Sequence, residues 1–393
     1  MQAQFSDPVQ LAQALIRCPS VTPAEAGALT LMQQVLTESG FSCHRLPFSG
    51  AGTPDVDNLY ARIGTTGPHL CFAGHTDVVP VGDPEKWTSP PFAAEIRDET
   101  LYGRGAVDMK GAIACFAVAA HRHLQQRNGL AHGSISLLLT GDEEGPAING
   151  TVKVLEWLAA NGQQIDAAVV GEPSNPDALG DEIKIGRRGS LNGEIIVAGK
   201  QGHAAYQKLA DNPVPKLARI IDRLYAEPLD QGTAHFEPSN LEVTVLSVPN
   251  AVTNVIPGEA RAGFNVRFND TFTRASLEHW VRARVNAAAR EVSADVSLGF
   301  SGNANAFVTE PGPLVEAMRS AIRDVTGRTA ALSTAGGTSD ARFIKDHCPV
   351  LEFGLINRSA HHTDEHVAVA DLIQLAAIYE RFLERFFVRP GDG

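Results

Sequence analysis

Along its first half, the chain alternates short, continuously apolar runs with longer segments in which apolar residues recur at helical spacing. The short runs predict buried strands at 57–63, 68–73, 133–140 and 167–171. The helical spacing predicts helices at 7–18, 25–39 and 109–126, the last of them buried because it is rich in Ala, Ile, Val and Phe. This alternation predicts an α/β fold, with a mostly parallel sheet and helices on both faces.

The hydrophobic pattern changes after residue 190. Residues 190–199 alternate apolar and polar positions, as expected of a strand with one buried face. Further elements are predicted in the order helix 213–225, strand 241–248, strand 259–268, helix 273–291 and strand 293–300. This β-α-β-β-α-β order resembles a ferredoxin-like module.

The end of the chain returns to the first pattern, with a helix at 311–326, a strand at 350–353 and a helix at 369–387. We therefore predict a discontinuous domain formed by residues 1–186 and 302–393, interrupted by an inserted domain formed by residues 187–301. The length agrees with this division, because 393 residues exceed what one hydrophobic core usually supports.

Composition narrows the class of protein. A hydrophobic content of 44% and a charged content of 20% are typical of a soluble globular protein. The net charge of −12 argues against nucleic acid as the partner, since phosphate binding needs a basic face. No apolar stretch is long enough to cross a membrane, and the first residues lack the pattern of a signal peptide. Five scattered cysteines with no C-x-x-C pair favour reduced thiols and a cytoplasmic location.

Polar clusters follow several of the apolar runs. They contain His75 and Asp77, Asp108, Asp142-Glu143-Glu144, Glu172, and the pair His361-His362. In parallel sheets, functional residues gather at the carboxyl ends of the strands, so these side chains are expected to meet. Imidazoles and carboxylates in these numbers suit two divalent cations and a general base, which indicates metal-assisted hydrolysis.

Each cluster also has a simpler interpretation. His75 alone would more often be a surface or hydrogen-bonded core histidine, but Asp77, two residues on, points to the same side and could accept the second ring N–H. Asp108 could be an ordinary helix N-cap, or its two oxygens could bridge two cations. The run Asp142-Glu143-Glu144 could be a solvated turn. If it is buried instead, one carboxylate could bind metal while its neighbour, with a raised pKa, moves the proton.

Motifs of other enzyme classes are absent from the sequence. It has no G-x-S-x-G elbow, no P-loop, no H-E-x-x-H and no G-x-G-x-x-G after a strand. A nicotinamide-dependent oxidoreductase is therefore not expected.

Four motifs mark a resemblance to a known family. Gly74-His-Thr-Asp77, Gly103-Arg-Gly-Ala-x-Asp-Met-Lys-Gly111, Asp142-Glu-Glu144 and Gly171-Glu-Pro173 resemble those of the co-catalytic zinc amidohydrolases and exopeptidases. This family includes acetylornithine deacetylase, aminoacylase and the glutamate carboxypeptidases. Five further motifs resemble its desuccinylase branch: Trp87 with Pro90-Pro-Phe92, Gly186–Ser190, Gly202–Tyr206 with Leu209–Pro213, Asn254–Glu259 and Gly336–Phe343.

The resemblance implies a zinc-exopeptidase-like catalytic domain with two Zn²⁺ ions, Co²⁺ being the alternative. One ion would be held by His75, Asp108 and Glu172, and the other by Asp108, Glu144 and His361. Asp108 would bridge the two ions, and the Asp108–Met109 peptide would be cis. Glu143 would be the general acid/base, and Asp77 would orient His75. Two adjacent histidines fit the last ligand position, and the spacing to Glu365 favours His361 over His362.

The resemblance also implies that the protein is a homodimer and that the inserted domain is its dimerisation and lid domain. His203 and Asn254 would reach the partner subunit's active site, with His203 helping to stabilise the oxyanion; the alternative for His203 is a surface loop. Carboxylates of the substrate would be contacted by Arg187, Ser190, Arg267, Gly336, Thr338 and Ser339. The arginine fork matches a carboxylate, although the pair Arg187-Arg188 could equally be a solvated turn.

The expected function is metal-dependent hydrolysis of N-succinyl-LL-2,6-diaminopimelate to succinate and LL-2,6-diaminopimelate, in lysine and diaminopimelate biosynthesis. A bridging water would attack the amide carbonyl, and Glu143 would carry its proton to the leaving amine. The alternatives are a related deacylase such as acetylornithine deacetylase, a dipeptidase, or a metal-binding or scaffolding protein without catalysis.

Overall fold

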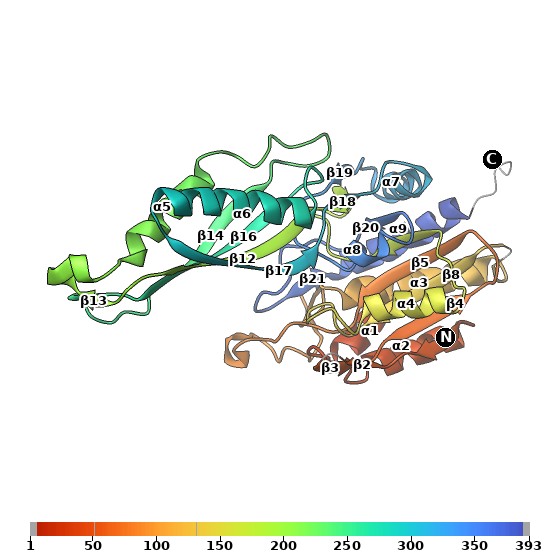
Figure 1. Cartoon of the computed structure of the whole chain (residues 1–393). Coiled ribbons are helices and arrows are strands. Elements are labelled where there is room, and N and C mark those ends of the chain that lie inside the picture. The colour runs from red at the N-terminus through yellow and green to blue at the C-terminus, as the bar shows by residue number, and fades with distance from the viewer. Residues whose placement is uncertain (1–5, 51, 131, 388–393) are drawn as a thin grey trace. The chain divides into compact units, whose positions relative to one another are not determined.

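The computed structural model describes residues 6–50, 52–130 and 132–387, which form two compact units (Figure 1). Unit 1 comprises the described residues up to Ile185, Thr309–Ser333 and those from Ser339 onward. Unit 2 comprises Gly186–Val308 and Thr334–Thr338. Residues 1–5 and 388–393 of the predicted first domain lie outside the described residues.

Unit 1 is built on an eight-stranded sheet with the order β1-β4-β8-β5-β9-β20-β10-β19. Its strands are β1 Ser42–Arg45, β4 Leu59–Ile63, β5 His69–His75, β8 Ser134–Thr140, β9 Ala167–Val170, β10 Glu182–Lys184, β19 Ala331–Ser333 and β20 Val350–Glu352. The strands β8, β5, β9 and β20 pair in parallel, and β4, β1 and β10 join the sheet through antiparallel pairs. The predicted mostly parallel sheet is confirmed.

Helices cover both faces of this sheet. They are α1 Pro8–Ile16, α2 Ala28–Glu38, α3 Lys110–Gln126, α4 Thr151–Ala160, α7 Pro313–Thr326, α8 Ala341–Ile344 and α9 Val369–Phe386. Phe72 of β5 lies opposite Leu137 of β8, and its ring stacks on Phe116 of α3. Tyr60 of β4 lies opposite Leu138, and its ring contacts Trp157 of α4. Since successive residues of a strand point to opposite faces, α3 and α4 lie on opposite sides of the sheet.

The parallel register brings three strand ends to one edge of the sheet. His75, the last residue of β5, lies opposite Thr140, the last residue of β8. Ala73 lies opposite Val170, the last residue of β9. The acidic run 142–144 and Glu172 therefore leave the sheet at the same edge as His75.

Short elements complete unit 1. They are β2 Phe48–Gly50, β3 Thr53–Val56, η2 Pro84–Lys86, β6 Glu95–Arg97, β7 Thr100–Tyr102 and β21 His366–Ala368. β21 pairs with β7 in antiparallel register, so that His366 lies opposite Tyr102. This pairing brings the segment after His361 next to the segment before Asp108.

Unit 2 is a four-stranded antiparallel sheet with the order β14-β16-β12-β17 and two long helices packed on one face (Figure 1). In chain order its main elements are β12 Gly189–Ala198, α5 Pro213–Tyr225, β14 Asn240–Ser247, β16 Glu259–Phe268, α6 Arg274–Glu291 and β17 Asp295–Ala304. This order is the predicted β-α-β-β-α-β module. Apolar residues from the sheet and both helices, such as Ile195, Ile220 and Val281, form its core.

Smaller pairs lie at the two ends of unit 2. β11 Gly186–Arg187 pairs with β18 Phe307–Val308, and β13 Gly202–His203 pairs with β15 Val255–Ile256. The 3-10 helix η3 Ala204–Leu209 follows β13.

Several elements were not predicted. The strands β1, β10 and β19 are three or four residues long and carry exposed or charged side chains, so they lack the apolar runs that mark buried strands. Helix α4 does carry apolar residues at helical spacing, at Val154, Leu155 and Leu158, and this pattern could have revealed it. Among residues 6–387 as the structure describes them, no helix is long and apolar enough to span a membrane.

Candidate metal centre

His75 lies at the centre of the cluster that forms at this edge of the unit 1 sheet. Its side chain is only 1% exposed. Nδ1 lies 2.8 Å from the backbone carbonyl oxygen of Asp77, which fixes the orientation of the ring. Nε2 lies 3.1 Å from Oδ1 of Asp108 and 3.7 Å from Oε1 of Glu172. The ring therefore turns Nε2 toward two carboxylates that follow other elements.

Asp77 serves the site in a different way from the one expected. Its carboxylate lies 3.7 Å from Nδ1 of His75, farther than its own backbone carbonyl. The carboxylate instead accepts the backbone N–H groups of Glu143, at 3.4 Å, and Glu144, at 3.1 Å. Burial raises the pKa of Asp77 to about 6, against the opposing charge of His75. Asp77 therefore connects the end of β5 to the acidic run after β8.

Asp108 presents one oxygen to each histidine. Oδ1 faces Nε2 of His75, and Oδ2 lies 3.2 Å from Nε2 of His361. Burial acts to raise the pKa of Asp108, but the hydrogen bonds from His361 and His75 outweigh it and hold the pKa well below its usual range. The Asp108–Met109 peptide is cis, as the family resemblance implied. This two-sided arrangement is what a bridging carboxylate requires.

His361 and Glu144 form the second side of the cluster. Nε2 of His361 lies 2.8 Å from Oε1 of Glu144. Hydrogen bonds to Asp108 and Glu144 raise the pKa of His361 to about 10. The backbone of His361, the first of the two histidines, has a φ of 62°, in the left-handed region, and its ring faces the carboxylates of Asp108 and Glu144.

Donor atoms close enough to share a cation form two groups within the described residues. One contains His75, Asp108 and Glu144, and the other contains His75, Glu143 and Glu172; the atoms of each group lie within 4.8 Å of one another. The second group includes Glu143, for which the family resemblance implies a role in proton transfer. The geometry therefore places Glu143 next to the ligand positions and leaves both roles open to it.

The electrostatics of the cluster fit a divalent cation. Burial and the charges of Asp108 and Glu143 raise the pKa of Glu172 well above its usual value. Burial likewise raises the pKa of Glu143 to about 8, against the opposing charge of His75. Burial alone would lower the pKa of His75, but its carboxylate neighbours raise it well above the usual value. Carboxylates that bind protons this strongly lack sufficient positive charge nearby, and a cation supplies it.

The remaining predicted residues lie mainly in unit 2. His203 and Asn254 are both exposed, and the N–H of Ala204 donates to the carbonyl of Asn254 at 2.9 Å, so the two lie near each other. Ser190 of β12 lies directly opposite Arg267 of β16, so their side chains leave the same face of the sheet.

Arg187 and the loop 334–338 form a second small group in unit 2. Arg187 is 7% exposed and donates from Nη1 to the carbonyl of Ala335 at 3.4 Å. Gly336 has a φ of 107°, a backbone conformation that favours glycine, and a Cβ there would also approach Nη1 of Arg187. Thr338 is partly buried in the same loop. Ser339 belongs to unit 1, where its buried hydroxyl donates to Glu352 at 2.5 Å. The substrate contacts of all these residues stay predictions.

One buried ion pair beside the cluster was not predicted. Arg104 and Glu365 are 2% and 0% exposed, and Nη1 of Arg104 lies 2.8 Å from Oε2 of Glu365. From the sequence, the spacing to Glu365 served only to favour His361 over His362. An arginine between two glycines in a motif rich in apolar residues is the signal that could have drawn attention to this pair.

Comparisons with known proteins agree with this geometry. A family model described as Peptidase family M20/M25/M40 matches residues 71–385. Succinyl-diaminopimelate desuccinylase of Methylorubrum populi is 59% identical over 97% of this chain and 98% of its own length. The protein of the same name from Rhodospirillum centenum is 58% identical over 97% of each chain. Among solved structures, an M20 family metallo-carboxypeptidase from Sulfolobus solfataricus superposes with a TM-score of 0.76 at 18% identity, covering 96% of this chain and 99% of the other.

The raised pKa values predict how the metal-free protein responds to pH. Glu143 stays protonated in the folded protein between pH 4.5 and about 8, whereas it ionises in the unfolded chain over the same window. The folded state then binds more protons, so its thermal stability should fall as the pH rises. The raised pKa values of Glu172, Asp77 and His75 act in the same direction. Asp108, whose pKa is lowered, contributes stability that is lost only below this window.

Zinc or cobalt added after chelation should reverse this trend. Metal ligands must be deprotonated, so the rise in melting temperature on adding metal should be larger at about pH 8 than at about pH 5. At a hundredfold excess over Kd, the gain corresponds to about 2.7 kcal/mol. Differential scanning calorimetry over a pH series, with and without metal, measures both effects. An equal gain at both pH values would contradict the assignment of the cluster as a metal site.

Proposed function

The chain belongs to peptidase family M20/M25/M40, and we propose that it hydrolyses N-succinyl-LL-2,6-diaminopimelate to succinate and LL-2,6-diaminopimelate, in the biosynthesis of lysine. The observation that carries this proposal is the high identity, over nearly the full length of the chain, to relatives that bear the name of this activity. The cluster in unit 1 supports it, since it has the donors that a metal-dependent amide hydrolase requires.

We propose two divalent cations, with zinc as the natural metal and cobalt as the alternative. His75, Asp108 and Glu172 would hold one cation, and Asp108, Glu144 and His361 the other. The two oxygens of Asp108, each facing a different histidine, support this division. When bound, the cations polarise the amide carbonyl and lower the pKa of a water molecule.

Glu143 is the proposed proton carrier. A general base needs a pKa near the working pH, and burial moves the carboxyl of Glu143 in that direction. Its carboxylate would take a proton from the attacking water and deliver it to the leaving nitrogen. Asp77 supports this role. Its carboxylate accepts the backbone N–H groups of Glu143 and Glu144 and so fixes the position of the main chain that carries both side chains.

The substrate has three carboxylates, and unit 2 offers residues to bind them. We propose that Arg187, Ser190, Arg267, Gly336, Thr338 and Ser339 contribute. Burial and the charge of Arg188 lower the pKa of Arg267, and among the described residues no carboxylate forms an ion pair with its guanidinium. A substrate carboxylate would form one and would be held by the planar fork of the arginine.

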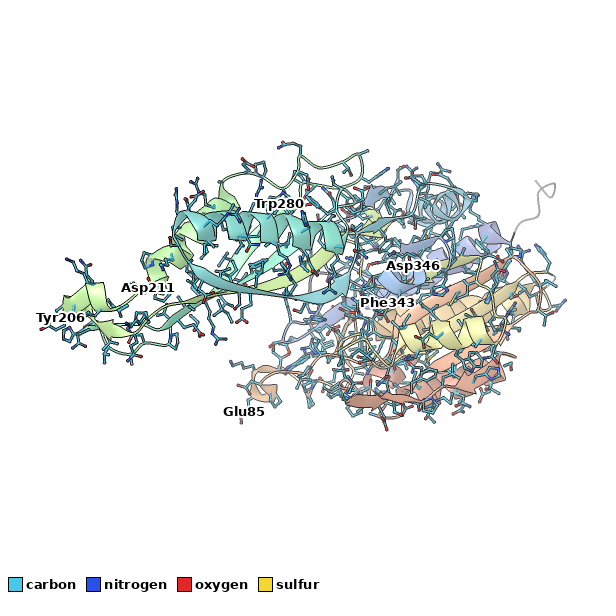
Figure 2. All side chains as sticks on the ribbon, viewed as in Figure 1. Glu85, Tyr206, Asp211, Trp280, Phe343 and Asp346 are labelled. Atoms are coloured by element: carbon cyan, nitrogen blue, oxygen red, sulfur yellow. The ribbon has the colours of Figure 1, made fainter. Side chains whose placement is uncertain are left out.

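We also propose a homodimer formed through unit 2, in which His203 and Asn254 would serve the partner's site. The edge strand β14 exposes Val245 by 55% and Leu246 by 68%. At the end of unit 2 near β13, Tyr206 and Leu209 are 65% and 70% exposed, and Figure 2 shows Tyr206 there. An unprotected apolar edge of this kind is typical of a surface that another chain covers.

The first experiment is a substrate comparison. We expect the metal-loaded protein to release succinate from N-succinyl-LL-2,6-diaminopimelate far faster than it releases acetate from N-acetylornithine. Glu143→Gln should lower kcat by about 10²- to 10⁴-fold, because general acid–base catalysis contributes that much. Its metal content, measured by atomic emission, should match the wild type. Preference for N-acetylornithine or for a dipeptide would instead favour a related deacylase or a dipeptidase.

Arginine recognition can be tested within one strand. Arg267→Lys keeps the charge but loses the planar fork of the guanidinium. Because a charge-assisted hydrogen bond to the substrate is lost, we expect KM for the succinyl substrate to rise by about tenfold or more. Arg261→Lys is the matched control, because Arg261 lies on β16 as well but is exposed and paired with Glu259. Steady-state kinetics of both variants measure KM. If Arg267→Lys has the same KM as Arg261→Lys, this role for Arg267 is excluded.

Light scattering tests the homodimer. We expect the wild type to have twice the mass of the chain. Leu246→Asp should shift it toward the monomer, because it places a charge on the proposed apolar interface. Ile373→Asp, at an apolar residue of α9 that is 52% exposed in unit 1, should leave the mass unchanged. A monomeric wild type would argue against the dimer and the roles given to His203 and Asn254.

A further inference from the structure

We propose that Glu365, together with Arg104, is a positioning residue that sets the distance between Asp108 and His361 and thereby the affinity for the cation they share. This inference rests on the proposed metal-dependent function. Neither residue is one of the proposed ligands, and both are almost fully buried in unit 1.

The carboxylate of Glu365 organises the loop that carries Asp108. Oε2 accepts the N–H of Gly105 at 3.0 Å, and Oε1 accepts the N–H groups of Val107 at 2.8 Å and Asp108 at 3.1 Å. The backbone carbonyl of Glu365 also accepts the N–H of Gly103 at 2.9 Å. One residue thus fixes the main chain on both sides of Arg104 and up to Asp108 itself.

The guanidinium of Arg104 organises the loop that carries His361. It donates to the carbonyl oxygens of His361, at 3.4 Å, and His362, at 3.2 Å, as well as to Glu365. It also lies 3.4 Å from the carbonyl of Pro80, which follows the His75 segment. The ion pair therefore connects the three main-chain segments that present His75, Asp108 and His361.

The connection matters because the two ligands start from distant parts of the chain. His361 is held in a left-handed backbone conformation, and its ring reaches Oδ2 of Asp108 at 3.2 Å. Metal affinity depends on ligand placement to within about 0.5 Å. Residues that hold ligands in place typically change metal affinity by about 10- to 100-fold when they are replaced. Loss of the pair should therefore affect the cation shared by Asp108, Glu144 and His361 more than the other one.

Glu365→Gln is the most conservative test. The amide keeps the shape of the side chain, but its NH₂ group donates and cannot accept the N–H groups or the guanidinium that face it. Arg104 would also lose its buried counter-charge. We expect the cation held by Asp108, Glu144 and His361 to bind about 10- to 100-fold more weakly, and the other cation, which shares only Asp108 with it, to be weakened less.

The measurement is isothermal titration of the chelated full-length protein with Zn²⁺, followed by the visible absorption of the Co²⁺-loaded protein, which reports ligand geometry. Activity of Glu365→Gln should recover as Co²⁺ is raised, a rescue that general destabilisation would not give. Asp230→Asn is the matched control. Asp230 also accepts backbone N–H groups, from Gly232 and Ser239, but it belongs to unit 2, whereas every proposed metal ligand belongs to unit 1. Its variant should bind both cations as the wild type does.

The outcomes separate this inference from the proposed function. Fewer than two cations in the wild type would contradict the proposed function and this inference together. Two cations in the wild type, with unchanged affinities and an unchanged Co²⁺ spectrum in Glu365→Gln, would overturn the inference alone. If Glu365→Gln does not fold, Arg104→Lys provides the same readout: weakened binding of one cation supports the inference, and wild-type binding overturns it.

Discussion

Negative charge held out of water is the constraint on which unit 1 depends. The carboxylates of Asp77, Asp108, Glu143 and Glu172 lie close together with the imidazole of His75, and all of them are buried or partly buried. Burying like charges is unfavourable unless protons or cations compensate them. The parallel register of β5, β8 and β9 nevertheless fixes these residues at one edge. The structure therefore retains an unfavourable cluster whose cost falls when positive charge arrives, so folding and metal binding are linked.

Hydrogen bonds to the backbone keep this cluster ordered. Asp77 accepts two N–H groups from the acidic run, and Glu365 accepts three from the Asp108 loop. Such bonds hold a main chain in place without occupying the side chains that perform the chemistry. The carboxylates near the site thus divide into those that belong to the donor cluster and those that hold the loops carrying the donors.

Much of this arrangement could be predicted from the sequence. The strands around the site are fully buried, so their runs are apolar throughout and easily identified, and the rule about strand ends then indicated His75 and Glu172. The sequence could not show whether the carboxylate or the backbone carbonyl of Asp77 orients the imidazole. This depends on how the segment after β5 meets the acidic run after β8, which no local pattern encodes. The position of Arg104 between two glycines could have marked it as unusual, but its pairing with Glu365 could not be predicted, since the two segments meet only once β7 and β21 have paired. In unit 2 the alternating strands revealed the module, whereas the roles proposed for His203 and Asn254 would require a second chain and stay predictions.

The insertion of unit 2 into unit 1 has a consequence for how the protein is made. β20, an interior strand of the unit 1 sheet, and His361 both follow unit 2 in the chain. A ribosome adds about 5–20 residues per second, and domains tend to fold as units during synthesis. Unit 2 is therefore complete while the sheet of unit 1 still lacks a central strand and the acidic cluster still lacks its last histidine. Until then the chain carries the carboxylates of the cluster without His361, so the cluster can be completed only after the whole of unit 2 has been made.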